Sequence, residues 1–299
     1  MRITVTGGTG FVGRRLVRHL QADNHSVHLL VRRGRTGLSQ NVEWSVWEAM
    51  DAGPPAESLA RADAIVHLSG EPIAQRWTPA AKQRILSSRA EGTRRLVRAL
   101  EPLPRKPAVL ISASAIGFYG SRGEEELSES SGPGSGFLPD VCREWEEAAG
   151  TAESLGVRVV SLRIGVVLGI EGGILAKIAP LFRLGAGGRL GAGNQWMSWI
   201  HIDDLSRLIR FALVNPHVRG PVNATAPSPV TNREFTQTLA SVLRRPAVLP
   251  VPAFAIASLF GEMAEVMLGG QRVLPRAAEA AGFGFHYPTL RLALEHLFA

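Results

Sequence analysis

The sequence predicts an α/β protein built on a doubly wound parallel sheet, with a smaller α+β lobe at its C-terminal end. Short apolar segments of strand length alternate with longer segments of helical period through the first half of the chain and beyond. A glycine-rich turn follows the first of these strands. Beyond about residue 225 the character of the sequence changes. We therefore expect a cofactor domain over residues 1–225 and a substrate lobe over residues 226–299.

The first element pair carries the strongest motif. Residues 2–6 have the pattern of a buried strand, and residues 11–22 that of a helix. Gly7, Gly10 and Gly13 stand between and within them at the spacing G-x-x-G-x-x-G. Gly7 allows a sharp turn, Gly10 lets the backbone approach a ligand, and Gly13 lets the helix pack closely. Free N–H groups at the helix start suit a pyrophosphate, so we predict a Rossmann-type dinucleotide site.

The end of the second strand indicates which dinucleotide is bound. This strand covers residues 27–31, and Arg32 and Arg33 follow it. In an NAD-binding unit an acidic residue at this place bonds the ribose 2′-hydroxyl, whereas arginine suits a 2′-phosphate. No acid stands here, so we predict NADP(H), with NAD(H) as the weaker alternative. A solvated basic loop is the other interpretation of these arginines.

Two later strands end in polar turns at the edge where ligands bind in parallel sheets. The strand over residues 64–68 contains His67, which we expect to be a bonded interior residue, and is followed by the turn over residues 69–72. The strand over residues 108–111 leads into Ser112 and Ser114. These serines are placed to bond substrate or nicotinamide, although serine is common in any such turn. The polar segment over residues 122–136, rich in Gly, Ser and Glu, is expected to be a mobile surface loop or a lid.

Further elements complete the prediction. Strands are expected at residues 42–47 and 157–163, and helices at residues 79–100, 137–152, 253–268 and 289–298. Asp203 and Asp204 open another helix, where carboxylates cap free N–H groups. The sequence T-N-R-E at residues 231–234 is a capping box.

Composition bounds the class of protein. With 299 residues, of which 45% are hydrophobic and 20% charged, the chain is an ordinary globular protein with a sizeable core. One cysteine, Cys142, excludes an internal disulfide and a cysteine-based metal site and fits a reducing, cytoplasmic compartment. The N-terminal apolar run is interrupted at once, and no run is long enough to cross a bilayer, so we expect neither a signal peptide nor membrane association.

The net charge of +7 could attract anionic partners. The arginines are spread over several helices, and the sequence shows no nucleic-acid motif and no basic stripe interleaved with aromatic residues. We therefore expect no nucleic-acid binding. A small phosphate-bearing ligand would still benefit from the positive field, and a homodimer through helices beside the sheet is an open alternative.

Several motifs resemble a known family. The sequence T-G-G-T-G-F-V-G at residues 6–13 and W-I-H-I-D-D-L at residues 199–205 resemble signatures of the extended short-chain dehydrogenase/reductase superfamily. The chain more closely resembles its sugar-nucleotide epimerase-like branch, over essentially the whole length, through L-S-G-E-P-I at 68–73, R-W at 76–77, G-V-V-L-G at 165–169, P-L-F-R-L-G at 180–185 and the tail at 269–287. The resemblance implies a nicotinamide cofactor in the first domain and a substrate cleft beside the smaller lobe.

The resemblance also exposes a departure. The superfamily carries a Tyr and a Lys four residues apart on the helix after the serine-bearing strand, where they perform acid/base catalysis. Asp140 and Glu144 hold those places here, and Arg89 holds the place of an asparagine near the active site. By similarity Ser114 matches the catalytic serine and Ser112 a serine on the cofactor side. Tyr119, with its pKa lowered by Arg89 or Arg163, and Glu71 are candidates for the missing acid/base.

The resemblance thus implies an NADP(H)-binding, epimerase-like oxidoreductase. The predicted catalytic residues are Ser114, Tyr119 and Glu71, and the predicted cofactor residues are Gly7, Thr9, Gly10, Phe11 and Val12 at the pyrophosphate, Arg32 and Arg33 at the 2′-phosphate, Leu68, Ser69, Gly70 and Glu71 at the adenosine and ribose, and Arg89, Ser112, Ile164 and Val167 toward the nicotinamide. The missing Tyr/Lys pair favours a rival function, a cofactor-binding sensor without turnover.

Overall fold

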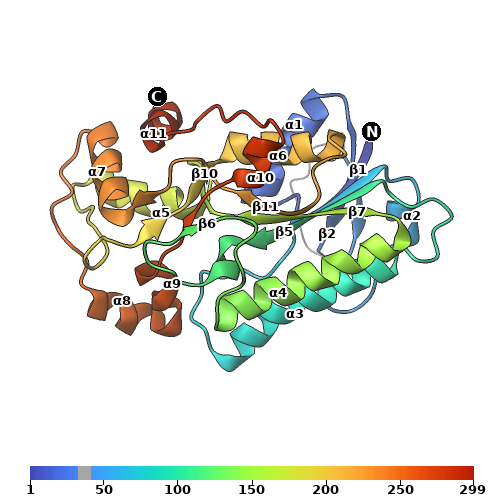
Figure 1. Cartoon of the computed structure of the whole chain (residues 1–299), viewed down its shortest axis with the longest axis horizontal. Coiled ribbons are helices and arrows are strands. Elements are labelled where there is room, and N and C mark those ends of the chain that lie inside the picture. The colour runs from blue at the N-terminus through green and yellow to red at the C-terminus, as the bar shows by residue number, and fades with distance from the viewer. Residues whose placement is uncertain (33–41) are drawn as a thin grey trace.

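The central feature of the protein is a seven-stranded parallel sheet, seen in a computed structural model that describes residues 1–32 and 42–299 (Figure 1). The strand order is β11-β7-β5-β4-β1-β2-β3. The bounds are β1 (Arg2–Thr6), β2 (Ser26–Val31), β3 (Glu43–Val46), β4 (Ala64–His67), β5 (Val109–Ala115), β7 (Arg158–Ile164) and β11 (Gly220–Ala224). The order reverses between β1 and β4, which places a crevice at their carboxyl ends. The predicted doubly wound parallel sheet is confirmed.

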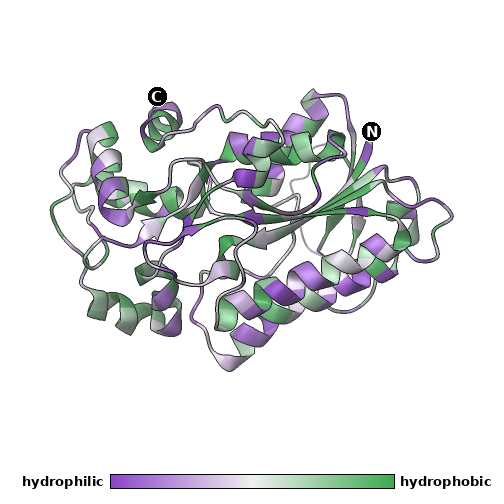
Figure 2. Ribbon diagram, viewed as in Figure 1, coloured by the Kyte–Doolittle hydropathy of each residue, from purple (hydrophilic) through white to green (hydrophobic). Residues whose placement is uncertain are grey.

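Helices cover both faces of this sheet, and each face has its own pair (Figure 1). The helices α1 (Phe11–Ala22) and α6 (Ile202–Val214) pack on one face, and α3 (Pro79–Arg98) and α4 (Phe137–Gly150) on the other. The short helix α2 (Ala56–Leu59) precedes β4, and the 3-10 turns η1 (Ile116–Tyr119) and η2 (Thr151–Leu155) follow β5 and α4. Hydrophobic residues dominate the strands, whereas the flanking helices alternate hydrophobic and hydrophilic faces (Figure 2).

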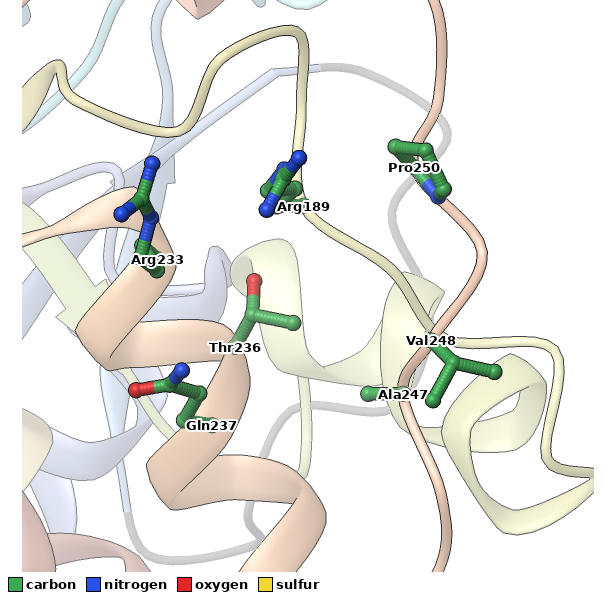
Figure 3. Close-up of a pocket in the computed structure, with 7 residues that line it drawn as sticks. All are labelled: Arg189, Arg233, Thr236, Gln237, Ala247, Val248 and Pro250. Carbon is green, nitrogen blue, oxygen red and sulfur yellow. The ribbon is translucent and has the colours of Figure 1, made fainter.

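The smaller lobe lies beside the sheet and contains mostly helices. It comprises β8 (Val166–Leu168), α5 (Gly173–Arg183), β9 (Trp196–Met197), β10 (Trp199–His201), β12 (Val230–Thr231), α7 (Asn232–Leu243), α8 (Ala253–Phe260), η3 (Gly261–Met263), α9 (Ala264–Leu268) and α11 (Leu290–Phe298). The predicted capping box opens α7: the Thr231 hydroxyl accepts from the Glu234 N–H, and the Glu234 carboxylate accepts from the Thr231 N–H. A small open pocket lies between α7 and the segments around residues 189 and 247–250 (Figure 3).

The tail of the chain returns to the sheet. The strand β13 (Arg272–Val273) pairs with β6 (Glu126–Leu127), and α10 (Arg276–Ala280) contacts β11. Ala278 and Phe283 belong to the same hydrophobic cluster as β1 and α1. The hydrophobic clusters therefore do not follow a single boundary along the chain, and the division into residues 1–225 and 226–299 stays a prediction.

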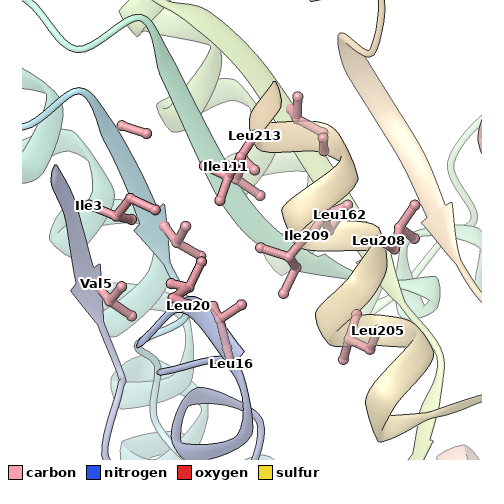
Figure 4. Packing of buried hydrophobic residues seen from close by; sticks show 14 of the residues in the cluster. Ile3, Val5, Leu16, Leu20, Ile111, Leu162, Leu205, Leu208, Ile209 and Leu213 are labelled. Carbon is pink, nitrogen blue, oxygen red and sulfur yellow. The ribbon is translucent and has the colours of Figure 1, made fainter. Parts of the chain in front are cut away.

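A buried cluster fixes α1 against the sheet (Figure 4). Leu16 and Leu20 recur on one face of α1, as Leu205 and Ile209 do on α6, and they meet strand residues such as Ile3 on the same side of the sheet. Burying each such side chain contributes about 1.5–3 kcal/mol. This packing holds the N-terminus of α1 at the carboxyl end of β1.

Two predicted elements differ from those observed. The segment 122–136 is fixed rather than free: Leu127 is fully buried, β6 pairs with β13, and Glu129 accepts hydrogen bonds from two distant backbone N–H groups. The predicted helix at residues 253–268 is broken at Gly261, whose φ of +59° ends α8. Within residues 1–32 and 42–299, none of the helices combines the length and the apolar character needed to cross a membrane.

Candidate functional site

The glycine turn after β1 leaves no room for a side chain at Gly7, Gly8 or Gly13. Gly7 has φ of +67°, and a Cβ added there would lie 2.8 Å from the carbonyl carbon of Leu68. The Gly10 N–H donates to the Gly7 carbonyl at 2.9 Å and closes the turn. A Cβ on Gly13 would overlap the Gly7 carbonyl oxygen. The sharp turn predicted at Gly7 is thus observed, and Gly13 packs on the turn itself.

The N-terminus of α1 presents donors that no side chain of its own turn uses. Gly10 is the N-cap and offers no side chain, and the first turn of α1 contains no acidic residue. The backbone N–H groups of residues 11–13 belong to the first turn, where no intrahelical acceptor exists. Together with the helix dipole they form a site for an anion at the carboxyl end of β1.

Phe11 joins this turn to the segment after β8. Its ring fits against Gly169, Gly172 and Gly173, where an added Cβ would lie 2.7–3.0 Å from ring atoms. Of the other predicted cofactor residues, Val12, Ile164 and Val167 are partly buried against the main hydrophobic cluster, and Thr9 is partly exposed. Phe11 therefore fixes the predicted pyrophosphate turn against the segment that follows β8.

The Thr6 hydroxyl holds the ends of β1 and β4 together. It accepts from the backbone N–H groups of Leu68 and Ser69, at 3.2 Å each, and lies 3.0 Å from the Ser69 hydroxyl. His67 Nδ1 lies 2.8 Å from the same oxygen, and its Nε2 lies 3.0 Å from Thr93 Oγ1. Burial lowers the pKa of His67 to about 4, so this side chain is a neutral, bonded interior residue, as the sequence predicts.

The predicted 2′-phosphate residues are only partly visible. Arg32 directly follows β2 and is exposed at the carboxyl edge of the sheet. Arg33 lies outside the described residues. An exposed arginine at this edge is accessible to a ligand, and its planar fork suits a phosphate.

Ser112 and Ser114 lie within β5 rather than beyond it. Both are buried, and the Ser112 hydroxyl donates to the Ala113 carbonyl at 3.2 Å. The Ser114 hydroxyl donates to Oε1 of Glu146 at 2.7 Å. Nε and Nη2 of Arg163 donate to the same carboxylate at 2.9 and 2.8 Å. Ser114 is therefore oriented by a buried ion pair that joins α4 to β7.

Tyr119 does not have the exposed, acidified hydroxyl that its predicted role needs. Its side chain is fully buried, and its hydroxyl donates to Asn223 Oδ1 at 2.7 Å and accepts from Arg163 Nη1 at 2.9 Å. Burial raises its pKa above the usual value, although the Arg163 hydrogen bond acts in the opposite direction. The expected lowering of this pKa is therefore not found, and we assign Tyr119 to the interior.

Glu71 remains within reach of solvent at the end of β4. Its side chain is 24% exposed, its Oε1 accepts from Gln75 at 3.2 Å, and the same oxygen lies 3.6 Å from Nε of Arg84. Its backbone N–H donates to the Ser88 hydroxyl at 3.0 Å. The carboxylate is thus positioned by α3 without being sealed, which suits a group that meets a ligand.

The two places that hold the Tyr and Lys in the superfamily face solvent. The side chains of Asp140 and Glu144 are 52% and 36% exposed. Asp140 pairs with Arg143 at 3.1 Å, and Glu144 pairs with Arg94 at 3.5 Å. The carboxylate on α4 that does reach the serine is Glu146. Its signal in the sequence was a charged residue on the same helical face as Cys142 and Ala149, which are buried.

A second polar cluster joins α6 to the C-terminal segment. Asp204 accepts from the backbone N–H groups of His286 and Tyr287 at 3.0 and 2.8 Å. Asp203 pairs with Arg15 of α1. The side chain that caps α6 is His201, whose Nδ1 accepts from the Asp203 N–H at 3.0 Å. The aspartates therefore hold neighbouring segments, and the capping role predicted for them belongs to His201.

His201, Asp203 and His296 lie close enough together to hold a metal ion. Their hydrogen bonds, however, use the atoms that a metal would need. Nδ1 of His201 accepts the Asp203 N–H, so the proton of its neutral ring is on Nε2, which lies 3.1 Å from Nδ1 of His296. A metal on that Nε2 would have to remove the last ring proton. Both Asp203 oxygens are also engaged by Arg15. The cluster is organised as a hydrogen-bonded chain that docks α11.

The pocket in the lobe is separate from these groups. Arg189 and Arg233 lie at one side, with Thr236 and Gln237 of α7 beside them, and the apolar wall is made of Ala247, Val248 and Pro250 (Figure 3). None of the described site residues predicted from the sequence lines it. The candidate site formed by the glycine turn and Ser114 therefore lies at the carboxyl edge of the sheet and not in this pocket.

Comparison with known proteins agrees with this arrangement. Residues 3–224 match the NAD dependent epimerase/dehydratase family. Residues 251–297 match a domain of unknown function, DUF1731.

Three relatives resemble the chain over nearly its whole length. A protein of Arabidopsis thaliana, "Epimerase family protein SDR39U1 homolog, chloroplastic", is 45% identical over 98% of this chain and 86% of its own. "Epimerase family protein YfhF" of Bacillus subtilis is 40% identical over 100% of this chain and 98% of its own. The crystal structure of the human epimerase family protein SDR39U1 (isoform 2) with NADPH is 36% identical, with a TM-score of 0.89, over 100% of this chain and 99% of that one.

Proposed function

Since the chain belongs to the NAD dependent epimerase/dehydratase family, we propose that it binds NADP(H) and acts as an epimerase-like oxidoreductase on a small-molecule substrate. The observation that carries this proposal is the uncapped N-terminus of α1 directly behind the Gly7–Gly10 turn. The human relative that was crystallised with NADPH supports the choice of cofactor.

The residues at the edge of the sheet fit such a cofactor. Gly10 is exposed, carries no side chain and closes the turn, so a pyrophosphate can approach the backbone at this place. Arg32 would meet the 2′-phosphate at the end of β2. The segment 68–71 would line the adenosine and ribose, since Thr6 holds it beside the glycine turn. Bound nicotinamide would supply the hydride that is transferred to or from a substrate carbon.

Ser114 and Glu71 are the groups we propose for contact with the substrate. Ser114 stands at the end of the central strand β5 with its hydroxyl oriented by Glu146. Glu71 stands at the end of the neighbouring strand β4 and keeps partial access to solvent. A carboxylate in this position can accept or return a proton during hydride transfer. Glu146 acts through Ser114 and is a positioning residue, since Arg163 holds its charge.

One observation favours the rival function, a sensor that binds NADP(H) without turnover. The places of the superfamily's Tyr and Lys are occupied by Asp140 and Glu144, and each is paired with an arginine at the surface. Turnover separates the two functions. Mixing the protein with NADPH and a panel of aldehydes and ketones should oxidise the cofactor if the protein is an enzyme, and Glu71→Gln or Ser114→Ala should slow that oxidation. NADPH binding without oxidation would favour the sensor.

Cofactor binding is tested first, by titration with NADPH and NADH followed by nicotinamide fluorescence. We expect NADPH to bind more tightly, and Arg32→Ala to weaken NADPH about tenfold or more, because a charge-assisted hydrogen bond contributes about 1.5–3 kcal/mol. Arg61→Ala is the matched control, since Arg61 is also exposed but precedes β4 at the opposite edge of the sheet. Failure of both cofactors to bind would refute the proposal.

A further inference from the structure

The guanidinium of Arg89 is buried between α3 and α4 beside the candidate site. Arg89 is 7% exposed and stacks on the ring of Trp145 of α4, with 5.0 Å between the guanidinium carbon and the ring centroid. It lies flat against Gly70, where an added Cβ would be 3.0 Å from the guanidinium carbon. Because Gly70 follows β4, the charge lies at the carboxyl edge of the sheet.

Two hydrogen-bond donors between α3 and α4 lack an acceptor among the described residues. Nη1 of Arg89 donates to the Ile85 carbonyl at 3.2 Å, while its buried Nε finds no acceptor in the part of the chain that the structure describes. Nε1 of Trp145, on the side chain that stacks on Arg89, is a second buried donor for which these same residues offer no acceptor. Each buried donor left unsatisfied costs about 1–3 kcal/mol. Two such donors on touching side chains indicate that an acceptor is to be supplied from outside the chain.

The charge of Arg89 is also uncompensated. Among residues 1–32 and 42–299, no carboxylate lies within ion-pair distance of it. The Cys142 thiol is neutral, because burial raises its pKa to about 11. Glu71 is more distant and is already engaged by Gln75 and Arg84. Burial lowers the pKa of Arg89, but a guanidinium in a protein remains protonated.

Arg163 shows what a structural arginine looks like in this fold. Its side chain is 5% exposed, about as deep as that of Arg89, and both oxygens of Glu146 accept from it. A buried charge without such a partner is unfavourable. Arg89 is therefore not explained by packing alone, and the missing partner is an anion.

The cofactor pyrophosphate is not that anion. The N-terminus of α1 lies on the face of the sheet that α1 and α6 cover, whereas Arg89 belongs to α3 on the opposite face (Figure 1). Arg89 instead lies against Gly70, directly before Glu71, which is one of the two groups we propose for contact with the substrate.

We propose that Arg89 receives an anionic group of the substrate, a carboxylate or a phosphate, and that this protein therefore acts on an anionic carbonyl or hydroxyl compound. This inference rests on the proposed function. The guanidinium fork would bind two oxygens of the anion.

The test uses oxalate and inorganic phosphate as probe anions, on the protein alone and on its NADPH complex. The readouts are the melting temperature of the protein and the fluorescence of bound NADPH. We expect one of the two anions to saturate both signals in the natural protein and to bind at least about tenfold more weakly in Arg89→Met, because losing one partner of a buried charge pair costs about 2–5 kcal/mol. Oxalate and phosphate distinguish a carboxylate from a phosphate ligand.

Two further variants keep the result interpretable. Arg89→Lys keeps the positive charge but loses the planar fork, so it should weaken anion binding to an intermediate degree. This variant also replaces Arg89→Met in the test if Arg89→Met does not fold. Arg98→Ala on the exposed end of the same helix should behave like the natural protein.

The outcomes separate the two proposals. No NADPH binding would refute the proposed function, while the melting temperature of the protein without cofactor would still report on Arg89. The inference is overturned if neither anion acts on the natural protein, or if Arg89→Met responds to the anion as the natural protein does. It is also overturned if Arg89→Met weakens NADPH as strongly as the anion, which would assign Arg89 to the cofactor.

Discussion

The Ser114 hydroxyl donates a 2.7 Å hydrogen bond to Glu146, although the two residues are 32 positions apart and belong to β5 and α4. Arg163 of β7 donates two hydrogen bonds to the same carboxylate. The serine that the sequence places at the edge of the sheet is thus oriented by a carboxylate that is fixed by a buried cation. Its orientation depends on the charge of Glu146, which makes that charge the first feature to test.

Replacing Glu146 by glutamine should destabilise the protein strongly. Arg163 would be left buried and without a counter-ion, and breaking a buried ion pair in this way costs about 3–5 kcal/mol. Urea denaturation followed by circular dichroism measures the loss. Glu147→Gln is the control on the same helix, since that side chain is 65% exposed and should change stability by less than about 1 kcal/mol. Equal losses in the two variants would show that the buried pair contributes nothing.

A methyl group on Gly13 should disrupt the turn that precedes it. The added Cβ would overlap backbone atoms of Gly7 and Gly8, and overpacking of this kind costs about 1–3 kcal/mol or more. We expect Gly13→Ala to lower both the melting temperature and the affinity for NADPH. Gly150→Ala is the matched control, because Gly150 ends α4 with open space around it and the substitution should stabilise by up to about 1 kcal/mol. A Gly13→Ala variant that melts like the natural protein would argue against tight packing at this turn.

The elements that the sequence predicts best are those with local signals. The first helix covers residues 11–22 as expected, because a glycine turn starts it and its apolar period is unbroken. The segment 122–136 shows the limit of such signals. Its polar composition predicts a free loop, whereas Glu129 bonds backbone groups 94 and 148 positions away. Pairing across such distances leaves no trace in local composition.

The same limit applies to the site. The glycine turn and the two serines can be predicted from the sequence, because their roles depend on their position within one strand–turn–helix unit. The depth of a side chain is not readable in that way, and Tyr119 is fully buried although it follows the serines closely. The position of Glu146 on a buried helix face can be predicted from the helical period. Its partner Arg163 cannot be predicted in this way, because it lies on the next strand of the sheet and the pairing depends on the fold.

Both tyrosines should ionise above the usual pKa. Burial raises the pKa of Tyr119 and of Tyr287, and Asp203 adds to the effect at Tyr287. Since the chain has only these two tyrosines, a spectrophotometric titration of the folded protein should show no tyrosinate until the pH is well above about 10. The unfolded chain ionises first, so stability from these groups is lost as the pH rises through that region.

Tyr119→Phe tests the interior role of this residue. The variant leaves Asn223 Oδ1 and Arg163 Nη1 each without a partner, so we expect a loss of about 1–3 kcal/mol in the free energy of unfolding. Any turnover of NADPH should stay within about twofold, because the hydroxyl does not reach a ligand. A much larger fall in turnover with little loss of stability would instead indicate that Tyr119 takes part in the reaction.

Two buried histidines should make stability fall as the pH drops below neutrality. Burial lowers the pKa of His67 and of His201 from the usual 6.5 to about 4. Between these values the unfolded chain binds protons that the folded protein does not, so the free energy of unfolding decreases with falling pH. The slope is at most about 1.4 kcal/mol per pH unit for each histidine.

The contribution of each histidine is read from the slope rather than from the absolute stability. Urea denaturation at several pH values between about 4 and 7 gives that slope for the natural protein and for His67→Gln. The variant keeps a polar group that can bond Thr6 and Thr93 but does not titrate, so its slope should be less steep by up to about 1.4 kcal/mol per pH unit in this window. Burial acts to raise the pKa of Asp203, but its hydrogen bond and ion pair with Arg15 hold that pKa below the usual value, so Asp203 loses its stabilisation only at lower pH. An unchanged slope in His67→Gln would mean that His67 is protonated in the folded protein, which its place between two hydroxyl groups in the interior argues against.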